Sequence, residues 1–127
     1  MKSCLNLNNM EYTTKDSGKR TKYESGFQRD TKEGKPRYDL IPGELLKRLA
    51  ELYARGAEKY GDNNWRLANT EKEFHHFKEC AWRHFMQWAN NWDEEEDHGI
   101  ACAWNIFAYI WLTEYKNVHK QKAQNRK

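Results

Sequence analysis

Cysteine is scarce in this chain of 127 residues, and the cysteines present form no recognisable pattern. The three thiols, Cys4, Cys80 and Cys102, are odd in number and widely spaced. This spacing excludes both a paired CxxC zinc motif and a disulfide framework. We therefore expect a reducing environment and predict a cytoplasmic location.

Long apolar runs are also missing. The N-terminus has no apolar core of a signal peptide, and the apolar run after Gly99 is too short and too interrupted to cross a bilayer. No membrane partner is predicted. Proline occurs only at Pro36 and Pro42, within residues 27–43, a stretch that we expect to be an extended lead-in.

Charge is nearly balanced, with 22 Lys and Arg against 19 Asp and Glu, which gives a net charge of +3. Much of the excess lies near the chain ends, so it is weak evidence for a nucleic-acid partner, and none is predicted. Residues 1–26 lack periodicity and predict a flexible polar tail, and residues 117–127 predict a basic tail. The intervening residues 27–116 predict one domain, which holds all six Trp.

Apolar periodicity predicts three helices, and no strand pattern competes with them. The first covers residues 43–60, the second opens at Thr70 with a TEKE capping box, and the third covers residues 94–115. The last of these is apolar nearly all round from Ile100 to Leu112, which predicts burial on several sides. The fold class is therefore all-α, a small bundle of three to four helices. So many Trp and Phe in a small domain predict completion by a second subunit.

An acidic cluster precedes the third helix in the stretch NWDEEEDHGIACAWN, residues 91–105. One interpretation is a helix start, with Asp93 as the cap and Glu96 three residues later. The other is a metal site, because five carboxylates exceed what a cap needs, and Asp93 and Asp97 repel each other at helical spacing. Both interpretations stay open on these grounds. Helical geometry would place Glu94, His98 and Asn105 on one face.

The second predicted helix carries a polar stripe that antiparallel packing could bring toward the acidic cluster. Its members are His76, Glu79, Arg83, Gln87 and Asn90. Carboxylate oxygens suit Mg²⁺ or Mn²⁺, and the basic side chains could hold phosphates. The basic candidates are Lys35, Arg37, Lys59 and Arg83.

Each of these candidates has a plain structural alternative. Arg83 could pair with Glu79, and the lysines and Arg37 could be solvated surface charges. His84 could be an interfacial histidine as readily as a catalytic one. Most Trp belong to a core, with Trp65 the first candidate to stack on a base.

Four ordered blocks carry a resemblance to a known family. They are GKPRYDLIP (residues 34–42), GAEKYGDNNW (56–65), RHFMQW (83–88) and EDHGIACAWN (96–105). The chain resembles the phage and bacterial dATP/dGTP diphosphohydrolase family, which is similar to MazG-like all-α nucleoside triphosphate pyrophosphohydrolases. The resemblance implies hydrolysis of a purine deoxynucleoside triphosphate to the monophosphate and pyrophosphate, with Mg²⁺ or Mn²⁺ as cofactor.

The resemblance also implies site residues, with one departure. The superfamily's ExxE pair is HxxE here, His76 and Glu79, whereas Glu94 and Asp97 supply the later ExxD pair. The predicted metal ligands are Glu79, Glu94, Glu96 and Asp97, of which Glu79, Glu96 and Asp97 are also the predicted catalytic residues. The predicted substrate-binding residues are Arg37, Lys59, Tyr60, Trp65, Arg83, His84, His98 and Asn105.

Two functional hypotheses follow. The first is an enzyme that controls a nucleotide pool in the cytoplasm, that of the host if a phage encodes it, and that acts as a homodimer or homotetramer. The second is a non-enzymatic helical module that binds nucleic acid or a host protein through its basic tails. The acidic cluster favours the first, because it would repel phosphate unless a cation intervened.

Overall fold

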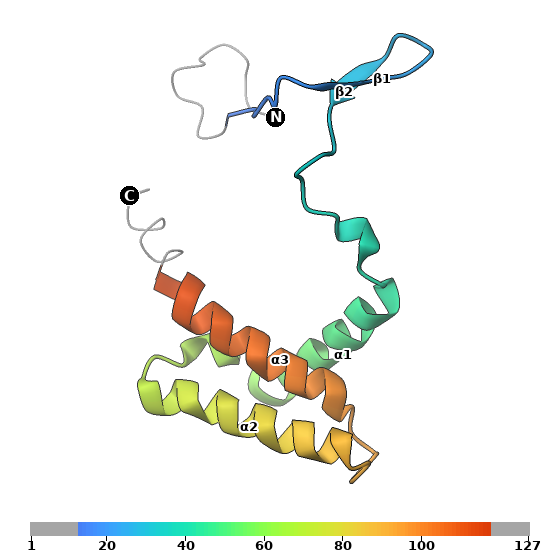
Figure 1. Ribbon diagram of the computed structural model, residues 1–127. Coiled ribbons are helices and arrows are strands. Elements are labelled where there is room, and N and C mark those ends of the chain that lie inside the picture. Colours follow the sequence, from blue (N-terminus) through green and yellow to red (C-terminus); the bar gives the residue numbers. More distant parts are fainter. Residues whose placement is uncertain (1–12, 118–127) are drawn as a thin grey trace. The chain divides into compact units, whose positions relative to one another are not determined.

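The computed structural model describes residues 13–117, which form two compact units (Figure 1). The first unit ends at Tyr38 and the second begins at Asp39. Residues 1–12 of the predicted N-terminal tail and residues 118–127 of the predicted basic tail lie outside the described range.

The first unit contains a β-hairpin that the sequence pattern did not predict. Strand β1 (Arg20–Lys22) pairs antiparallel with β2 (Gln28–Asp30). The turn uses Gly26 at φ 89°, a left-handed conformation that glycine adopts without steric cost. Neither strand alternates apolar and polar residues, so the period-two signal was absent. The predicted boundary between residues 26 and 27 falls inside this hairpin.

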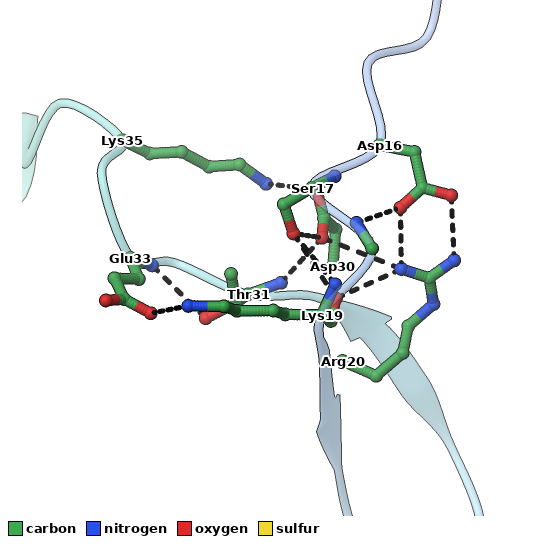
Figure 2. A network of polar contacts seen from close by, with 9 residues as sticks. Asp16, Ser17, Lys19, Arg20, Asp30, Thr31, Glu33 and Lys35 are labelled. Carbon is green, nitrogen blue, oxygen red and sulfur yellow. Dashed lines mark hydrogen bonds and ion pairs between the residues drawn. The ribbon is translucent and has the colours of Figure 1, made fainter.

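Polar contacts surround the base of the hairpin (Figure 2). The Arg20 guanidinium donates to both carboxylate oxygens of Asp16, at 2.7 and 2.9 Å. The Ser17 hydroxyl donates to Asp30, and this bond is the largest cause of a lowered pKa for the Asp30 carboxyl. Lys35 Nζ lies 3.4 Å from the same carboxylate. Local polar contacts and an aromatic contact between Tyr23 and Phe27 therefore stabilise the described part of this unit.

The second unit is all-α, as predicted. The 3₁₀ turn η2 (Tyr38–Leu40) lies at the boundary of the two units. The segments within the second unit are α1 (Gly43–Tyr60), η3 (Asn64–Leu67), α2 (Glu71–Ala89), α3 (His98–Ile110) and the π-helical turn η4 (Trp111–Tyr115). Helix α3 runs antiparallel along α2 and also packs on α1 (Figure 1). The connection from α2 to α3 carries the acidic cluster, so helix packing fixes where that cluster lies.

The predicted helix starts are right for α1 and α2. Helix α1 occupies residues 43–60 as expected and ends before Gly61, whose φ is 94°. Thr70 caps α2, because its hydroxyl accepts from the Glu73 amide at 3.2 Å. The Glu73 carboxylate in turn accepts from the Thr70 hydroxyl at 2.8 Å. The capping box is thus confirmed in its main bond.

The predicted start of the third helix is wrong by four residues. Helix α3 begins at His98, and its N-cap residue is Asp97 rather than Asp93. Asp93 instead has φ 51° and lies in the loop, a left-handed conformation that Asp and Asn tolerate better than most residues. Glu94 is therefore not on the helical face that His98 and Asn105 share, and the acidic cluster is a loop.

Aromatic rings form much of the core around Trp104, in the middle of α3. The rings of Tyr53, Trp65, Trp104 and Trp111 meet edge to face, at centroid distances from 5.2 to 6.3 Å. Ala108 and Leu112 of α3 and η4 are also buried. Ile106 and Phe107 remain about half exposed, so the predicted burial of this helix on several sides is not met within the single chain. Among the described residues, no helix is both long enough and apolar enough to cross a membrane.

Candidate functional site

A polar pocket of about 160 Å³ lies where α2 passes into α3. It is lined by Gln87, Trp88, Asn91, Trp92, Glu94, Glu96, Asp97, His98 and Gly99. Gly99 allows the Trp88 ring to close against the first turn of α3, since an added Cβ would lie 3.0 Å from Trp88 Cδ1. Three of the predicted metal ligands, Glu94, Glu96 and Asp97, therefore line one pocket.

His98 is the buried polar centre of this region, with only 4% of its surface exposed. Its Nε2 lies 2.6 Å from the Asp93 carbonyl oxygen. A carbonyl can only accept, so Nε2 must carry the proton. In the neutral ring the lone pair is then on Nδ1, which is the nitrogen that faces the other polar groups.

His84 of α2 and Glu96 of the loop meet His98 at that nitrogen. The Nδ1 atoms of His84 and His98 are 2.9 Å apart, and Glu96 Oε2 lies 3.7 Å from His98 Nδ1. One potential ligand atom from each of the three residues lies within 4.8 Å of the other two. Burial lowers the pKa of His84, and the positive charge of Arg83 lowers it further, whereas Glu96 opposes this shift. We call these three residues the histidine cluster.

Asp97 is engaged by an arginine that the sequence analysis did not single out. The Arg48 guanidinium on α1 donates to both Asp97 carboxylate oxygens, at 2.9 and 2.5 Å. This bidentate pair is the largest cause of a lowered pKa for Asp97. It ties α1 to the start of α3, so Asp97 has a structural role besides its position in the polar pocket.

Glu79, the fourth predicted metal ligand, lies elsewhere. It lines an apolar groove of about 590 Å³ between α2 and α3. The groove is lined by His75, Phe77, Lys78, Glu79, Ala81, Trp82, Phe85, Cys102, Asn105, Ile106 and Tyr109. Glu79 Oε1 is 3.3 Å from His75 Nε2, and the buried Asn105 side chain donates to the Ala101 carbonyl at 2.8 Å. The predicted carboxylates are therefore divided between a polar pocket and an apolar groove.

The remaining predicted substrate residues occupy different surroundings. Lys59 lies at the end of α1 with its Nζ 5.0 Å from the Tyr60 ring centre. Tyr60 is the main cause of a raised pKa for Lys59, and the negative charge of Glu96 adds to it. Trp65 belongs to the aromatic core, while Arg37 belongs to the first unit.

Two side chains near the pocket, Arg48 and Gln87, are not among the predicted site residues. Arg48 lies 49 residues from its partner Asp97, and no local spacing links residues so far apart. Gln87 lies three residues after His84 on α2, a spacing that places both on one side of the helix. Its Oε1 is buried, and among the described residues it has no hydrogen-bond partner. Its place in the predicted polar stripe of this helix was the available signal.

The fold and the pocket define a small all-α protein with carboxylates and histidines gathered where two antiparallel helices connect. Residues 25–123 match the family model described as dATP/dGTP diphosphohydrolase, N-terminal. The chain belongs to this family, so the predicted family is confirmed. No curated protein and no solved structure matches it. The family's name implies a diphosphohydrolase, and with it a nucleotide substrate.

Proposed function

We propose that this chain hydrolyses purine deoxynucleoside triphosphates, dATP or dGTP, to the monophosphate and pyrophosphate in a metal-dependent reaction. The observation that carries the proposal is the family match, which covers residues 25–123. The acidic polar pocket supports it, because a triphosphate approaches clustered carboxylates only when a cation neutralises the charge. Such an enzyme would control a nucleotide pool in the cytoplasm, that of the host if a phage encodes the protein.

The polar pocket offers a donor set that suits the metal implied by the family. Glu94, Glu96 and Asp97 line it together, and carboxylate oxygens are the ligands that Mg²⁺ and Mn²⁺ favour. Glu94 and Glu96 would hold the ion, with Asp97 contributing from beside Arg48. Such an ion, when bound, would neutralise phosphate charge and make water easier to deprotonate.

Glu96 is the carboxylate that we propose as the base for the attacking water. Its side chain is exposed to solvent, whereas both oxygens of Asp97 are engaged by Arg48. The Arg48 pair also lowers the pKa of Asp97, which makes that carboxylate a weaker base. Asp97 would then position the start of α3 and add negative charge.

Basic and aromatic side chains would hold the nucleotide. The negative charge of Glu96 raises the pKa of Lys59, and the positive charge of Arg83 lowers the pKa of His84. Both cations therefore interact electrostatically with the histidine cluster. They would balance the triphosphate, with Tyr60, His84, His98 and Asn105 contributing to substrate selection. Glu79 stays a separate proposed ligand, because it lines the apolar groove. Arg37 and Trp65 stay proposed substrate contacts on the family resemblance alone.

We also propose that the chain assembles as a homodimer or homotetramer that covers the apolar groove. Trp82 at the groove is 74% exposed, and Phe85 and Ile106 beside it are about half exposed. Neighbouring exposed aromatic and aliphatic side chains of this kind are typical of protein interaction surfaces.

The test of the activity is direct. The full chain is incubated with each deoxynucleoside and ribonucleoside triphosphate, with Mg²⁺, with Mn²⁺ or with EDTA, and monophosphate and pyrophosphate are measured. We expect turnover of dATP or dGTP that EDTA abolishes. Absence of metal-dependent turnover for every nucleotide would refute the proposal.

A further inference from the structure

The histidine cluster combines nitrogen and oxygen donors from two helices and a loop. His84 comes from α2, Glu96 from the connection, and His98 from the first turn of α3. Mg²⁺ favours oxygen ligands, whereas imidazole nitrogens suit divalent transition metals such as Zn²⁺. The cluster therefore differs in chemistry from the carboxylate site proposed for the triphosphate, although Glu96 borders both.

Two of its donor separations are close to those of a tetrahedral metal site, and the third lies within 4.8 Å. Ligand bonds of 2.0–2.1 Å at tetrahedral angles place two donor atoms about 3.3 Å apart. The two Nδ1 atoms are 2.9 Å apart, and Glu96 Oε2 is 3.7 Å from His98 Nδ1. Each separation thus differs from the ideal by about 0.4 Å, which side-chain rotation can supply.

The surroundings of His98 orient it as a ligand. Its Nε2–H donates to the Asp93 carbonyl, which leaves the Nδ1 lone pair directed at the cluster. Metal-binding histidines are usually fixed in this way, with the second ring nitrogen donating to a carbonyl or carboxylate. The loop conformation of Asp93, at φ 51°, is what brings that carbonyl into position.

We propose that His84 Nδ1, His98 Nδ1 and one carboxylate oxygen of Glu96 bind a divalent transition-metal ion such as Zn²⁺. Binding replaces the hydrogen bond between the two rings, and the proton on His84 Nδ1 moves to its Nε2, so the ring stays neutral. Three protein ligands leave a fourth position for water or another ligand. The inference concerns metal binding alone and is tested without nucleotide, although the site shares Glu96 with the proposed function.

The test is equilibrium dialysis and calorimetry of the full, metal-free chain with Zn²⁺ alone and with Mg²⁺ alone. Substituting Co²⁺ adds an absorption spectrum that reports the ligand type. We expect one Zn²⁺ per chain, a Mg²⁺ affinity that His84→Gln leaves unchanged, and a Co²⁺ spectrum without thiolate bands. His84→Gln and Glu96→Gln should each weaken Zn²⁺ binding at least about tenfold.

His76→Gln is the matched control, because His76 is an exposed histidine of the same helix. It should leave Zn²⁺ affinity unchanged, and circular dichroism should show the same helicity for all variants. Unchanged affinity in both His84→Gln and Glu96→Gln would overturn the proposal. So would thiolate bands in the Co²⁺ spectrum that indicate binding by Cys80 or Cys102.

Discussion

The polar pocket and the apolar groove lie on the same pair of helices but differ in what surrounds their carboxylates. Glu94, Glu96 and Asp97 share the pocket with His98. Arg48 of α1 donates to Asp97, and His84 of α2 contacts His98. Glu79 lies among aromatic and aliphatic side chains, with His75 as its close polar contact. The pocket thus resembles a site that holds charge, and the groove resembles a surface that binds another apolar surface.

This difference shows that two residues can share a helix face without belonging to the same pocket. Residues on one helix face at spacings of three and four can still belong to different pockets when the stripe is long. Glu79 and Gln87 are eight residues apart, which corresponds to about 12 Å along a helix. Helical spacing predicts a shared face, but the partner helix determines which chemistry each end of that face meets.

The largest expected effect comes from the pocket carboxylate that we propose as the base. Glu96→Gln should lower turnover of the preferred nucleotide by about 100-fold, because general-base catalysis typically contributes that much or more. Glu95→Gln is the matched control, since Glu95 has the same charge in the same loop but does not line the pocket. Steady-state kinetics of both variants, with helicity verified, provide the measurement. Equal activity of Glu96→Gln and the native chain would place the base elsewhere.

The next effect concerns the groove as a contact surface. Trp82→Glu should shift the assembly toward monomer and raise its dissociation constant by about 30-fold, as expected for loss of a central aromatic contact. Leu67→Glu is the control, because Leu67 lies outside the groove but is as exposed as Trp82, at 76% against 74%. Analytical ultracentrifugation over a range of concentrations measures both. If both variants assemble like the native chain, the groove is not the interface.

Much of the helical unit could be predicted from sequence, because its cause is local. Apolar periodicity and a capping box are sufficient to place α1 and the start of α2, and neither depends on distant residues. The start of α3 could not be placed this way, since Asp93 and Asp97 are both of a residue type that caps helices. Asp97 becomes the N-cap in a loop where Arg48 of α1 holds its carboxylate.

The candidate site was predicted only in part, for a similar reason. The acidic loop and His98 carried a visible signal, a charged run leading into an apolar helix. The meeting of His84 with His98 depends on the register between α2 and α3, which no single-helix pattern contains. The hairpin was missed because polar contacts such as Asp16–Arg20, rather than apolar alternation, hold it together.

A smaller effect is expected at the groove carboxylate. Glu79→Gln should reduce metal-dependent turnover by about tenfold, an effect equivalent to about 1.4 kcal/mol of transition-state stabilisation. The physical reason is the loss of one negative charge that we propose to assist metal binding from outside the pocket. Titrating activity with Mn²⁺ should show a raised half-saturating concentration. His76→Gln serves as the control for changes on the same helix. If Glu79→Gln lowered turnover as much as Glu96→Gln, the pocket and the groove would serve one site.

The smallest effect concerns the Arg48–Asp97 pair, which distinguishes Asp97 from Glu94 and Glu96 in the same pocket. Arg48→Met should lower the thermal midpoint by about 2 to 4 °C near neutral pH, because it removes the bidentate pair with Asp97. The folded state lowers the pKa of Asp97, so this stabilisation is complete above the unfolded value of about 4 and is lost as pH falls below it. The difference between Arg48→Met and the native chain should therefore shrink below about pH 4. The control Lys47→Met, at an exposed neighbouring residue, should leave the thermal midpoint nearly unchanged at any pH. A similar drop of the midpoint in both variants would contradict a specific role for the Arg48–Asp97 pair.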